Sequence, residues 1–377
     1  DEFDDGKLKK HYAIQLCLYV EILEELGFAT SKKGLIIDIT QNEVEYDLES
    51  PQGVRNTVTW WQEYESVKNS VERLLRNDIK NDPAYAGICK LCGWYNSCKK
   101  WCVDNQDLTT IFYLGRSNRD IILKDLNIRK VEDLCSINVS NLVLQKKSDK
   151  AFLKGFGETL LNKFLSRARI LSQTKKPIAY QKISFPQVSI ELFFDIEDDP
   201  TQDMVYLHGL YERKNGVGKF IYFLAKENSV KAERLAWQNF WEYIKDLPRD
   251  QYAVYYYSHH EKTTYKKLQE KYPDVITAQE VESFFDHPNV IDLYQIVTKY
   301  TDWPLSSYSL KDLATYLKFK WRDETPSGAL SIQWFNEYLN SRDENILKRI
   351  IEYNEDDCKA TMVLRDGLTR LEIQDKA

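Results

Sequence analysis

One stretch decides the fold of the C-terminal half of the chain: SIELFFDIEDDP, residues 189–200. It opens with an apolar run typical of a buried strand and ends with two acids two positions apart, Asp195 and Glu197. Alternate side chains of a strand point to the same face, so both carboxylates would lie together. Like charges at such a place repel and are costly to desolvate, and a divalent cation bound by their hard oxygens removes that cost. The alternative is an acidic turn that merely ends a strand, because D-x-E is a short and common pattern.

Three further strands are predicted after this one: MVYLHGLYE (204–212), KFIYFLAK (219–226) and QYAVYYYS (251–258). The first three strands are joined without a long helix, which favours an antiparallel meander. A helix over 228–246 precedes the fourth strand, and the remaining chain is mostly helical. This order predicts an α/β domain of the RNase H-like type, in which helices flank a mixed sheet.

Composition limits the other possibilities. The chain has 377 residues, of which 43% are hydrophobic, enough for two or three domains with real cores. The net charge of -6 argues against a surface coated with positive charge for nucleic acid, although a local basic surface is compatible with it. No stretch has the length of a membrane span or the character of a signal peptide, so a cytoplasmic protein without membrane partners is expected.

A second acidic segment, IIEYNEDDCKATMVL (350–364), is predicted to form a helix near the C-terminal end. Tyr353 and Asp357 are four positions apart and would share one helical face. Asp357 would complete a metal site, and the hydroxyl of Tyr353 would orient the attacking water. The alternative is the polar face of a surface helix.

A third segment, YYYSHHEKTTYKKL (255–268), begins as the fourth strand and becomes a helix near Glu261. His259, His260 and Glu261 would therefore lie at a strand-to-helix junction, where ligands often gather. The alternative is an ordinary helix start, because the helix dipole favours Glu in the first turn.

Together, D-x-E on the first strand, an acid after the fourth strand and Y-x-x-x-D on a late helix resemble the DEDDy branch of the DnaQ-like exonucleases. One position departs from that family. Its second motif usually carries Asp, whereas the candidate here is Glu261, with Asp292 in VIDLYQIV (290–297) as a competing ligand.

The resemblance implies hydrolysis of phosphodiester bonds with two Mg²⁺ or Mn²⁺ ions. Asp195 would bridge both ions, Glu197 and Asp357 would ligate one each, and Tyr353 would hold the water. SSYSLKDLATYL (306–317) and GALSIQWF (328–335) look like further segments of the family. Lys311 within the former would either approach a phosphate or be a surface lysine.

Four of the seven cysteines fall in a short segment with the spacing C-x2-C-x5-C-x3-C. Clustered cysteines in a reducing compartment indicate metal binding rather than disulfides. The predicted cofactor is a zinc ion or an iron–sulfur cluster, and the alternative is free buried thiols. The residues are Cys89, Cys92, Cys98 and Cys102.

The cysteine spacing resembles the last three ligands of the iron–sulfur cluster in RecB-like nucleases with a PD-(D/E)xK core. The helix HYAIQLCLYVEIL (11–23) is similar to the Q-x-x-x-Y helix of that family through Gln15 and Tyr19. The catalytic D-x-K strand should precede this helix, and it does not occur before Lys7. We therefore expect that part of this domain lies upstream of Asp1, and we assign no catalytic residues to it.

A helix-hairpin-helix is predicted in the middle of the chain, from LKGFGETLLNKFLSRARIL (153–171). Its turn would bind phosphate through backbone N–H groups at a helix start without reading bases, using Lys154, Gly155 and Gly157. Between residues 146 and 176 there are nine Lys or Arg against two acids, which predicts salt-sensitive binding. YLGRSNRDIIL (113–123) would supply a partner hairpin through Gly115 and Arg116. The alternative is a structural connector.

These observations predict three domains: a partial RecB-like domain over 1–105, a helix-hairpin-helix-like region over 106–178 and an RNase H-like domain over 179–377. The layout resembles prokaryotic RecB-like putative nucleases that join the first kind of domain to the last. It implies a 3'–5' exonuclease on single-stranded DNA, with RNA left open and with defence or repair proteins as partners. The competing hypothesis is a non-catalytic DNA-binding or scaffolding subunit of a larger complex.

Overall fold

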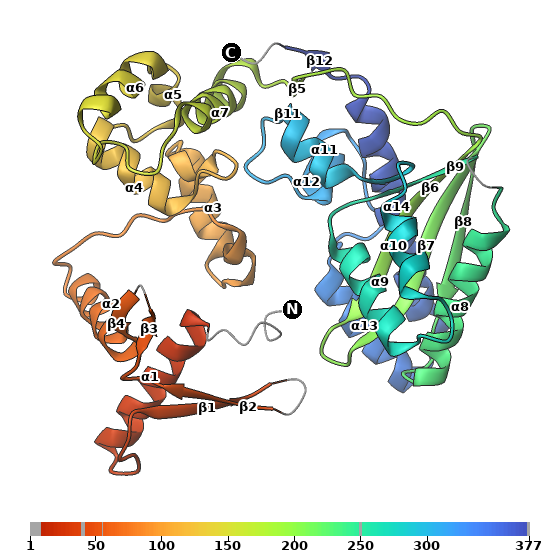
Figure 1. The fold of residues 1–377 in the computed structure, drawn as a ribbon, viewed down its shortest axis with the longest axis horizontal. Helices are drawn as coiled ribbons and strands as arrows, with labels where there is room; N and C mark the ends of the chain where they lie inside the picture. The colour runs from red at the N-terminus through yellow and green to blue at the C-terminus, as the bar shows by residue number, and fades with distance from the viewer. Residues whose placement is uncertain (1–8, 39–41, 55, 249–250, 375–377) are drawn as a thin grey trace. The chain divides into compact units, whose positions relative to one another are not determined.

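The computed structural model describes residues 9–38, 42–54, 56–248 and 251–374, and the chain divides into two compact units at Asp82/Pro83. The sequence placed its first boundary later, after residue 105. No helix in these described ranges combines the length and the apolar character needed to cross a membrane. Figure 1 shows the elements of each unit along the chain.

The first unit is small. Its helices α1 (Lys10–Glu25) and α2 (Trp60–Leu75) pack with the hairpin of β1 (Lys33–Ile37) and β2 (Glu43–Asp47) around buried aromatic side chains. The helix predicted over 11–23 is thus present.

A hairpin precedes the second helix of this unit. This second hairpin consists of β3 (Pro51–Gly53) and β4 (Asn56–Thr59). The helix begins only after Thr59, whose side chain accepts a hydrogen bond from Gln62 N in a capping box.

The second unit begins with a helical region built around one hydrophobic core. Even its longest helices have fewer than four helical turns. The two connecting segments that the sequence predicted to be tight turns each precede a helix, as expected. The elements are η1 (Gly87–Leu91), α3 (Tyr95–Asp104), η2 (Leu108–Thr110), α4 (Gly115–Leu126), α5 (Val131–Leu134), α6 (Val139–Ser148), α7 (Glu158–Arg169) and η3 (Ile170–Thr174).

A five-stranded sheet forms the centre of the C-terminal domain, with strand order β10-β9-β6-β7-β8. The antiparallel meander consists of β6 (Ile190–Asp199), β7 (Met204–Lys214) and β8 (Val217–Leu224), as the sequence predicted. β9 (Tyr252–Tyr256) and β10 (Val290–Asp292) add parallel to its other edge. The sequence did not predict β10, which has only three residues.

Helices cover both faces of this sheet (Figure 1). On one face α8 (Val230–Asp246), α9 (His260–Lys271) and α10 (Ala278–Phe285) pack on the even-numbered side chains of β6, such as Phe194. On the other face lie α11 (Leu293–Tyr300), α12 (Leu310–Tyr316), α13 (Gly328–Ser341) and α14 (Glu344–Leu368). Because side chains alternate along β6, Asp195 and Glu197 point to the side that α14 covers.

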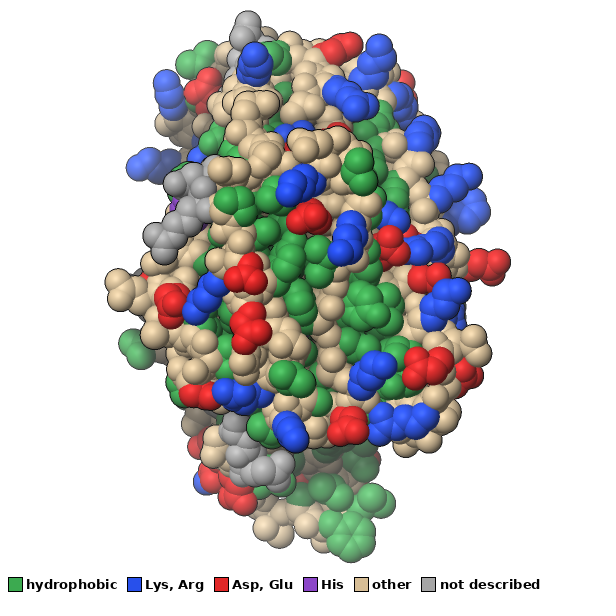
Figure 2. Space-filling model, turned by 90° about the vertical axis from the view of Figure 1, so that its right-hand side faces the viewer, with side chains coloured by type: hydrophobic (Ala, Val, Ile, Leu, Met, Phe, Trp, Pro, Cys, Tyr) green, Lys and Arg blue, Asp and Glu red, His purple; other side chains and the backbone are tan. Residues whose placement is uncertain are grey.

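A small second sheet brings the start and the end of this domain together. β5 (Ile178–Ala179) lies between β11 (Thr301–Asp302) and β12 (Glu372–Ile373). The face that lies to the right in Figure 1 carries Lys and Arg mixed with Asp and Glu, with hydrophobic side chains between them (Figure 2). Neither sign of charge gathers there into one broad patch, so this face is not a basic surface of the kind that binds nucleic acid.

Candidate metal centre

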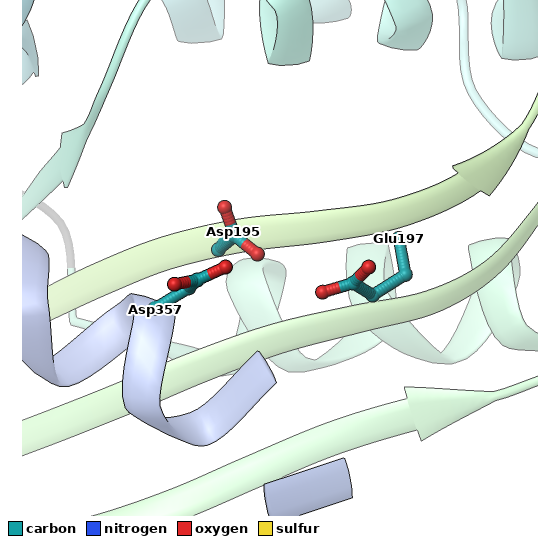
Figure 3. A group of neighbouring side chains, drawn as sticks. All are labelled: Asp195, Glu197 and Asp357. Carbon is teal, nitrogen blue, oxygen red and sulfur yellow. The ribbon is translucent and has the colours of Figure 1, made fainter. Parts of the chain in front are cut away.

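Asp195, Glu197 and Asp357 come together although two elements far apart in the sequence carry them. Each offers a carboxylate oxygen, and these oxygens all lie within 4.8 Å of one another. Figure 3 shows the side chains of β6 and α14 directed into a common space. Glu197 and Asp357 are buried, while Asp195 is partly exposed. The sequence predicted this grouping, and the oxygens are of the kind that Mg²⁺ and Mn²⁺ prefer.

The three carboxylates crowd one another, which raises their proton affinity. Burial, and then the charges of Asp357 and Glu197, raise the pKa of Asp195 well above its usual value. Burial and the charge of Asp357 raise the pKa of Glu197 to about 8. The pKa of Asp357 is raised as well, chiefly by burial. A cation at the site would offset both the desolvation of the acids and their mutual repulsion, because it favours the ionised form of each acid.

Asn354 holds the two acids of β6 from helix α14. Its Nδ2 donates to Asp195 Oδ2 at 2.8 Å and to Glu197 Oε1 at 3.4 Å. It is fully buried and packs on Gly209 of β7, the register partner of Asp195. A Cβ at position 209 would lie 1.7 Å from Asn354 Oδ1, so only glycine admits this amide. Neither residue was predicted from the sequence, although Asn354 lies within the acidic segment 350–364.

Asp357 is oriented by a donor from outside its own helix. Trp321 Nε1 donates to Asp357 Oδ1 at 2.7 Å. The next residue, Arg322, forms hydrogen bonds with the carboxylate of Asp356 and so fixes the segment that carries the indole. Trp321 was not predicted, because nothing local in the sequence links it to α14.

Tyr353 and Lys311 meet beside the acids. Lys311 Nζ donates to the Tyr353 hydroxyl at 2.7 Å and to Pro326 O at 2.9 Å. Burial and the nearby carboxylates raise the pKa of Tyr353 far above its usual value, so this phenol stays protonated. Lys311 lines the site, which decides between the two roles considered for it: it is not a surface lysine.

A cavity of about 370 Å³ opens over two of the carboxylates. Its lining includes Asp195, Asp357 and Lys311, together with Tyr257 and Asp312 from the C-terminal domain and Tyr95 from α3. The cavity therefore places three acids and a cation in one space that solvent can enter. Its size is in the range of ligand pockets, roughly 300–1,000 Å³.

The two candidates for the fourth acid differ in their surroundings. Both oxygens of Asp292 accept hydrogen bonds, from Ser258 N, Tyr294 N and Gln295 Nε2, so this residue caps α11. Glu261 is buried, and its Oε2 accepts no hydrogen bond from the described part of the chain. Burial raises the pKa of Glu261 to about 8, and its charge contributes to the raised pKa of Asp195.

The junction that carries Glu261 is built as predicted, with β9 ending at Tyr256 and α9 beginning at His260. Ser258 has φ 94°, an unusual value for a residue with a side chain, and its N–H donates to Asp292. His260 points elsewhere and pairs with Asp198 at 3.0 Å. Glu261 lies outside the 4.8 Å group of acids, although its charge reaches Asp195.

The cysteine segment folds into η1 and α3, but its sulfurs are not gathered. Among the residues that the structure describes, the three acids are the only group of three or more potential ligands within 4.8 Å. Cys102 is fully buried beside Thr109, Cys92 is exposed, and Cys89 and Cys98 are half-buried. The metal at the cysteines therefore stays a prediction.

The two predicted hairpins differ in what they face. In the second, Gly155 has φ 90°, and Lys154, Gly155 and Gly157 are exposed before α7. In the first, Tyr113 takes the equivalent place with φ 66°, ahead of Gly115 and the exposed Arg116.

The first hairpin docks on the C-terminal domain. The hydroxyl of Tyr113 bonds that of Tyr294 at 2.5 Å, and the ring of Phe112 stacks on Tyr308. Arg167 of α7 donates to Phe112 O and to Asp302 Oδ1, both at 2.7 Å. The Arg167 and Asp302 side chains are only 2% and 1% exposed. Arg167 therefore adds nothing to the basic surface that the sequence composition suggested.

In the first unit, Gln15 Nε2 donates to the Tyr19 hydroxyl at 2.6 Å. The Q-x-x-x-Y pair thus shares one exposed face of α1. The predicted absence of a D-x-K strand ahead of Lys7 lies outside the described residues.

A comparison with family models gives one match, to the RNase_H superfamily over residues 192–369. The C-terminal domain is therefore RNase H-like, in agreement with its sheet and with the position of its acids. No curated protein and no solved structure matches the chain significantly.

Proposed function

We propose that this chain is a divalent-metal-dependent nuclease, a 3'–5' exonuclease of the DEDDy type that acts on single-stranded DNA ends. The observation that carries the proposal is the meeting of Asp195, Glu197 and Asp357 within 4.8 Å inside an RNase H-like domain. The polarity and the choice of DNA over RNA rest on the resemblance to the DnaQ-like exonucleases.

The residues at the site suit two Mg²⁺ or Mn²⁺ ions. All three side chains offer hard oxygens, and burial raises the pKa of each, with repulsion between acids adding to it at Asp195 and Glu197; bound cations would relieve both. When bound, such ions activate water and stabilise the leaving oxygen of the phosphodiester. The resemblance implies that Asp195 would hold both ions, and in keeping with this Asp195 lines the cavity and is the one of the three acids that is partly exposed.

The side chains around the acids would position the substrate. Tyr353 stays protonated, so it can orient a water molecule through its hydroxyl but cannot act as a base. Lys311 faces the same cavity, and its ammonium would attract the phosphate. Glu261 is the better candidate for the fourth acid, because its buried oxygen is unpartnered within the described chain while Asp292 is fully used as a cap.

The helical region would hold the nucleic acid. The exposed second hairpin and the lysines near it support sequence-independent binding to phosphates through Lys154, Gly155 and Gly157. The first hairpin, with Gly115 and Arg116, would contribute less because its tip is engaged with Tyr294. A zinc ion or an iron–sulfur cluster at the cysteines, a RecB-like first unit and partners in defence or repair belong to the same proposal.

Replacing one acid should abolish the reaction. We expect Asp195→Asn or Asp357→Asn to lower Mn²⁺-dependent degradation of a 3'-labelled single-stranded oligonucleotide by more than about 100-fold, beyond the effect typical of residues that only orient ligands. Glu344→Gln is the matched control, because this acid lies exposed in the first turn of α14 and is not part of the metal centre. Undiminished degradation by the Asp195 variant would exclude this site as the catalytic centre.

The competing function is a non-catalytic scaffold that retains an RNase H-like fold. The observation that favours it is the distance of Glu261 from the other three acids. Calorimetric titration of Mn²⁺ separates the two functions. Binding that Asp195→Asn abolishes supports the enzyme, and heat independent of Asp195 and Asp357 supports the scaffold.

A further inference from the structure

The wall of the cavity over the carboxylates includes a side chain from the cysteine segment. Tyr95, the first residue of α3, lies between Cys92 and Cys98 and lines the same cavity as Asp195 and Asp357. Its neighbour Trp94, the N-cap residue of α3, is 74% exposed. An indole this exposed, next in sequence to a residue that lines the cavity, is open to contact with another molecule.

Several contacts fix Tyr95 at the cavity. Lys99 Nζ donates to its hydroxyl at 3.3 Å, and the ring of Tyr85 lies beside it with centroids 6.3 Å apart. The backbone N–H of Tyr85 donates to Thr109 Oγ1 at 2.8 Å, and Thr109 in turn is bonded to Asp107. The aromatic ring is therefore held in place before any ligand arrives, which lowers the entropic cost of binding.

We propose that Trp94 and Tyr95 form a stacking platform for unpaired bases at the entrance of the metal centre. This inference rests on the proposed function and names the part of the site that selects a single strand. The cavity is lined by the aromatic ring of Tyr95, by the ammonium group of Lys311 and by the carboxylates of the acids. A terminal nucleotide has the matching parts, namely a base, a phosphate and the bond to be cut.

The platform would discriminate by strandedness rather than by sequence. Every base has an aromatic face, so stacking on a protein ring tolerates all four bases. A base in a duplex is already stacked on its neighbours and gains little from the platform. We therefore expect single-stranded ends to bind more tightly than blunt duplex ends, and the difference to depend on the two rings.

The test is a binding measurement that needs no catalysis. Affinity for a fluorescent single-stranded oligonucleotide is measured by anisotropy in EDTA, for the wild type and for Trp94→Ala, Trp94→Phe and Tyr95→Phe. Loss of one ring should weaken binding about 5-fold to 150-fold, the range of stacking on one base. The two phenylalanine variants keep a ring and should bind like the wild type. Leu235→Ala, at an exposed position of α8, is the control.

A second measurement excludes a merely structural role. The same oligonucleotide carrying an abasic site at its 3' end should bind the wild type more weakly, yet bind Trp94→Ala no more weakly than the intact oligonucleotide does. Two results would contradict the proposed platform. One is equal affinity of Trp94→Ala and the wild type for the intact oligonucleotide. The other is an abasic site that weakens binding to Trp94→Ala as much as it weakens binding to the wild type. Either result leaves the degradation assay with Asp195→Asn unaffected, so the two proposals fail separately.

Discussion

Metal ligands were predicted from the sequence in two regions, the acids of the C-terminal domain and the cysteines of the helical region. The fold brings the ligand atoms together in the first region and not in the second. Asp195 and Asp357 lie far apart in the chain, and the fold brings their oxygens together. The four cysteines between Cys89 and Cys102 lie in one short segment, yet the fold buries Cys102, leaves Cys92 exposed and half-buries the other two.

The difference follows from what holds each group in place. The acids sit on a central strand and a long helix whose positions are fixed by large hydrophobic cores. The cysteines sit on short elements with few buried side chains. A site on rigid elements is formed before the ion arrives, whereas a site on short elements needs the ion to order it.

Among substitutions that leave the acids themselves in place, we expect the largest effect on activity when the hydrogen-bond donors that orient Asp195 and Asp357 are removed. Asn354→Leu and Trp321→Phe keep the approximate size of each side chain and remove the hydrogen bonds to Asp195 and Asp357. We expect degradation of the labelled oligonucleotide to fall by about 10-fold to 100-fold for each variant, as for other residues that orient metal ligands. Full activity in both variants would show that the acids need no such support. Gln238→Leu on α8, whose amide bonds only with Arg234 and Glu242, is the control.

A smaller effect should appear in the dependence of stability on pH. The pKa of Glu197 is about 8 in the folded protein and near 4.5 without the fold. A raised carboxyl pKa means that the folded state holds its proton longer than the unfolded state. The stability from this group is therefore full at low pH and is lost as the pH rises from about 4.5 to 8.

The melting temperature of the protein in EDTA should accordingly fall between pH 5.5 and pH 8, by about 2–4 °C for each kcal/mol lost. Mn²⁺ should restore it more at pH 8 than at pH 5.5, because cations and protons compete for the same oxygens. In Glu197→Gln the pH dependence should be shallower than in the wild type. Identical slopes in the two proteins would contradict the crowding of these acids.

The smallest effect is expected for an exposed cysteine in the absence of metal. Cys92→Ser should change the free energy of unfolding in EDTA by less than about 0.5 kcal/mol, as surface substitutions do. If the cysteines bind zinc or iron, metal should raise the melting temperature of the wild type and not that of Cys92→Ser. The absorbance of the purified protein distinguishes the metals, since only an iron–sulfur cluster is brown. Alkylation in EDTA should modify Cys92 quickly and spare Cys102, which is buried.

Long periodic segments carried most of what the sequence predicted. The meander of β6, β7 and β8 and the helix α8 follow from apolar runs with clear ends, and the strand-to-helix junction at His260 follows from the same pattern. The edge strand β10 was missed because three residues give no period.

The sequence predicted the metal ligands of the site but not the residues that hold those ligands in place. Acids spaced by two in a strand and by four from a tyrosine in a helix identify themselves through that spacing. Trp321, Gly209 and Asn354 do not, because their roles arise from contacts between elements that the sequence does not order in space. Tyr95 was missed for the same reason, since it reaches the cavity from another part of the unit.

The buried pair of Arg167 and Asp302 bears on how this RNase H-like domain can be produced in isolation. A fragment that starts at residue 179 would begin where the sequence places the domain boundary, yet it would leave out the guanidinium that neutralises Asp302. Removing one partner of a buried ion pair costs about 3–5 kcal/mol, a large part of the stability of a typical domain. A fragment that starts at Pro83, where the compact unit begins, keeps both charges and is the better choice for expression and crystallisation.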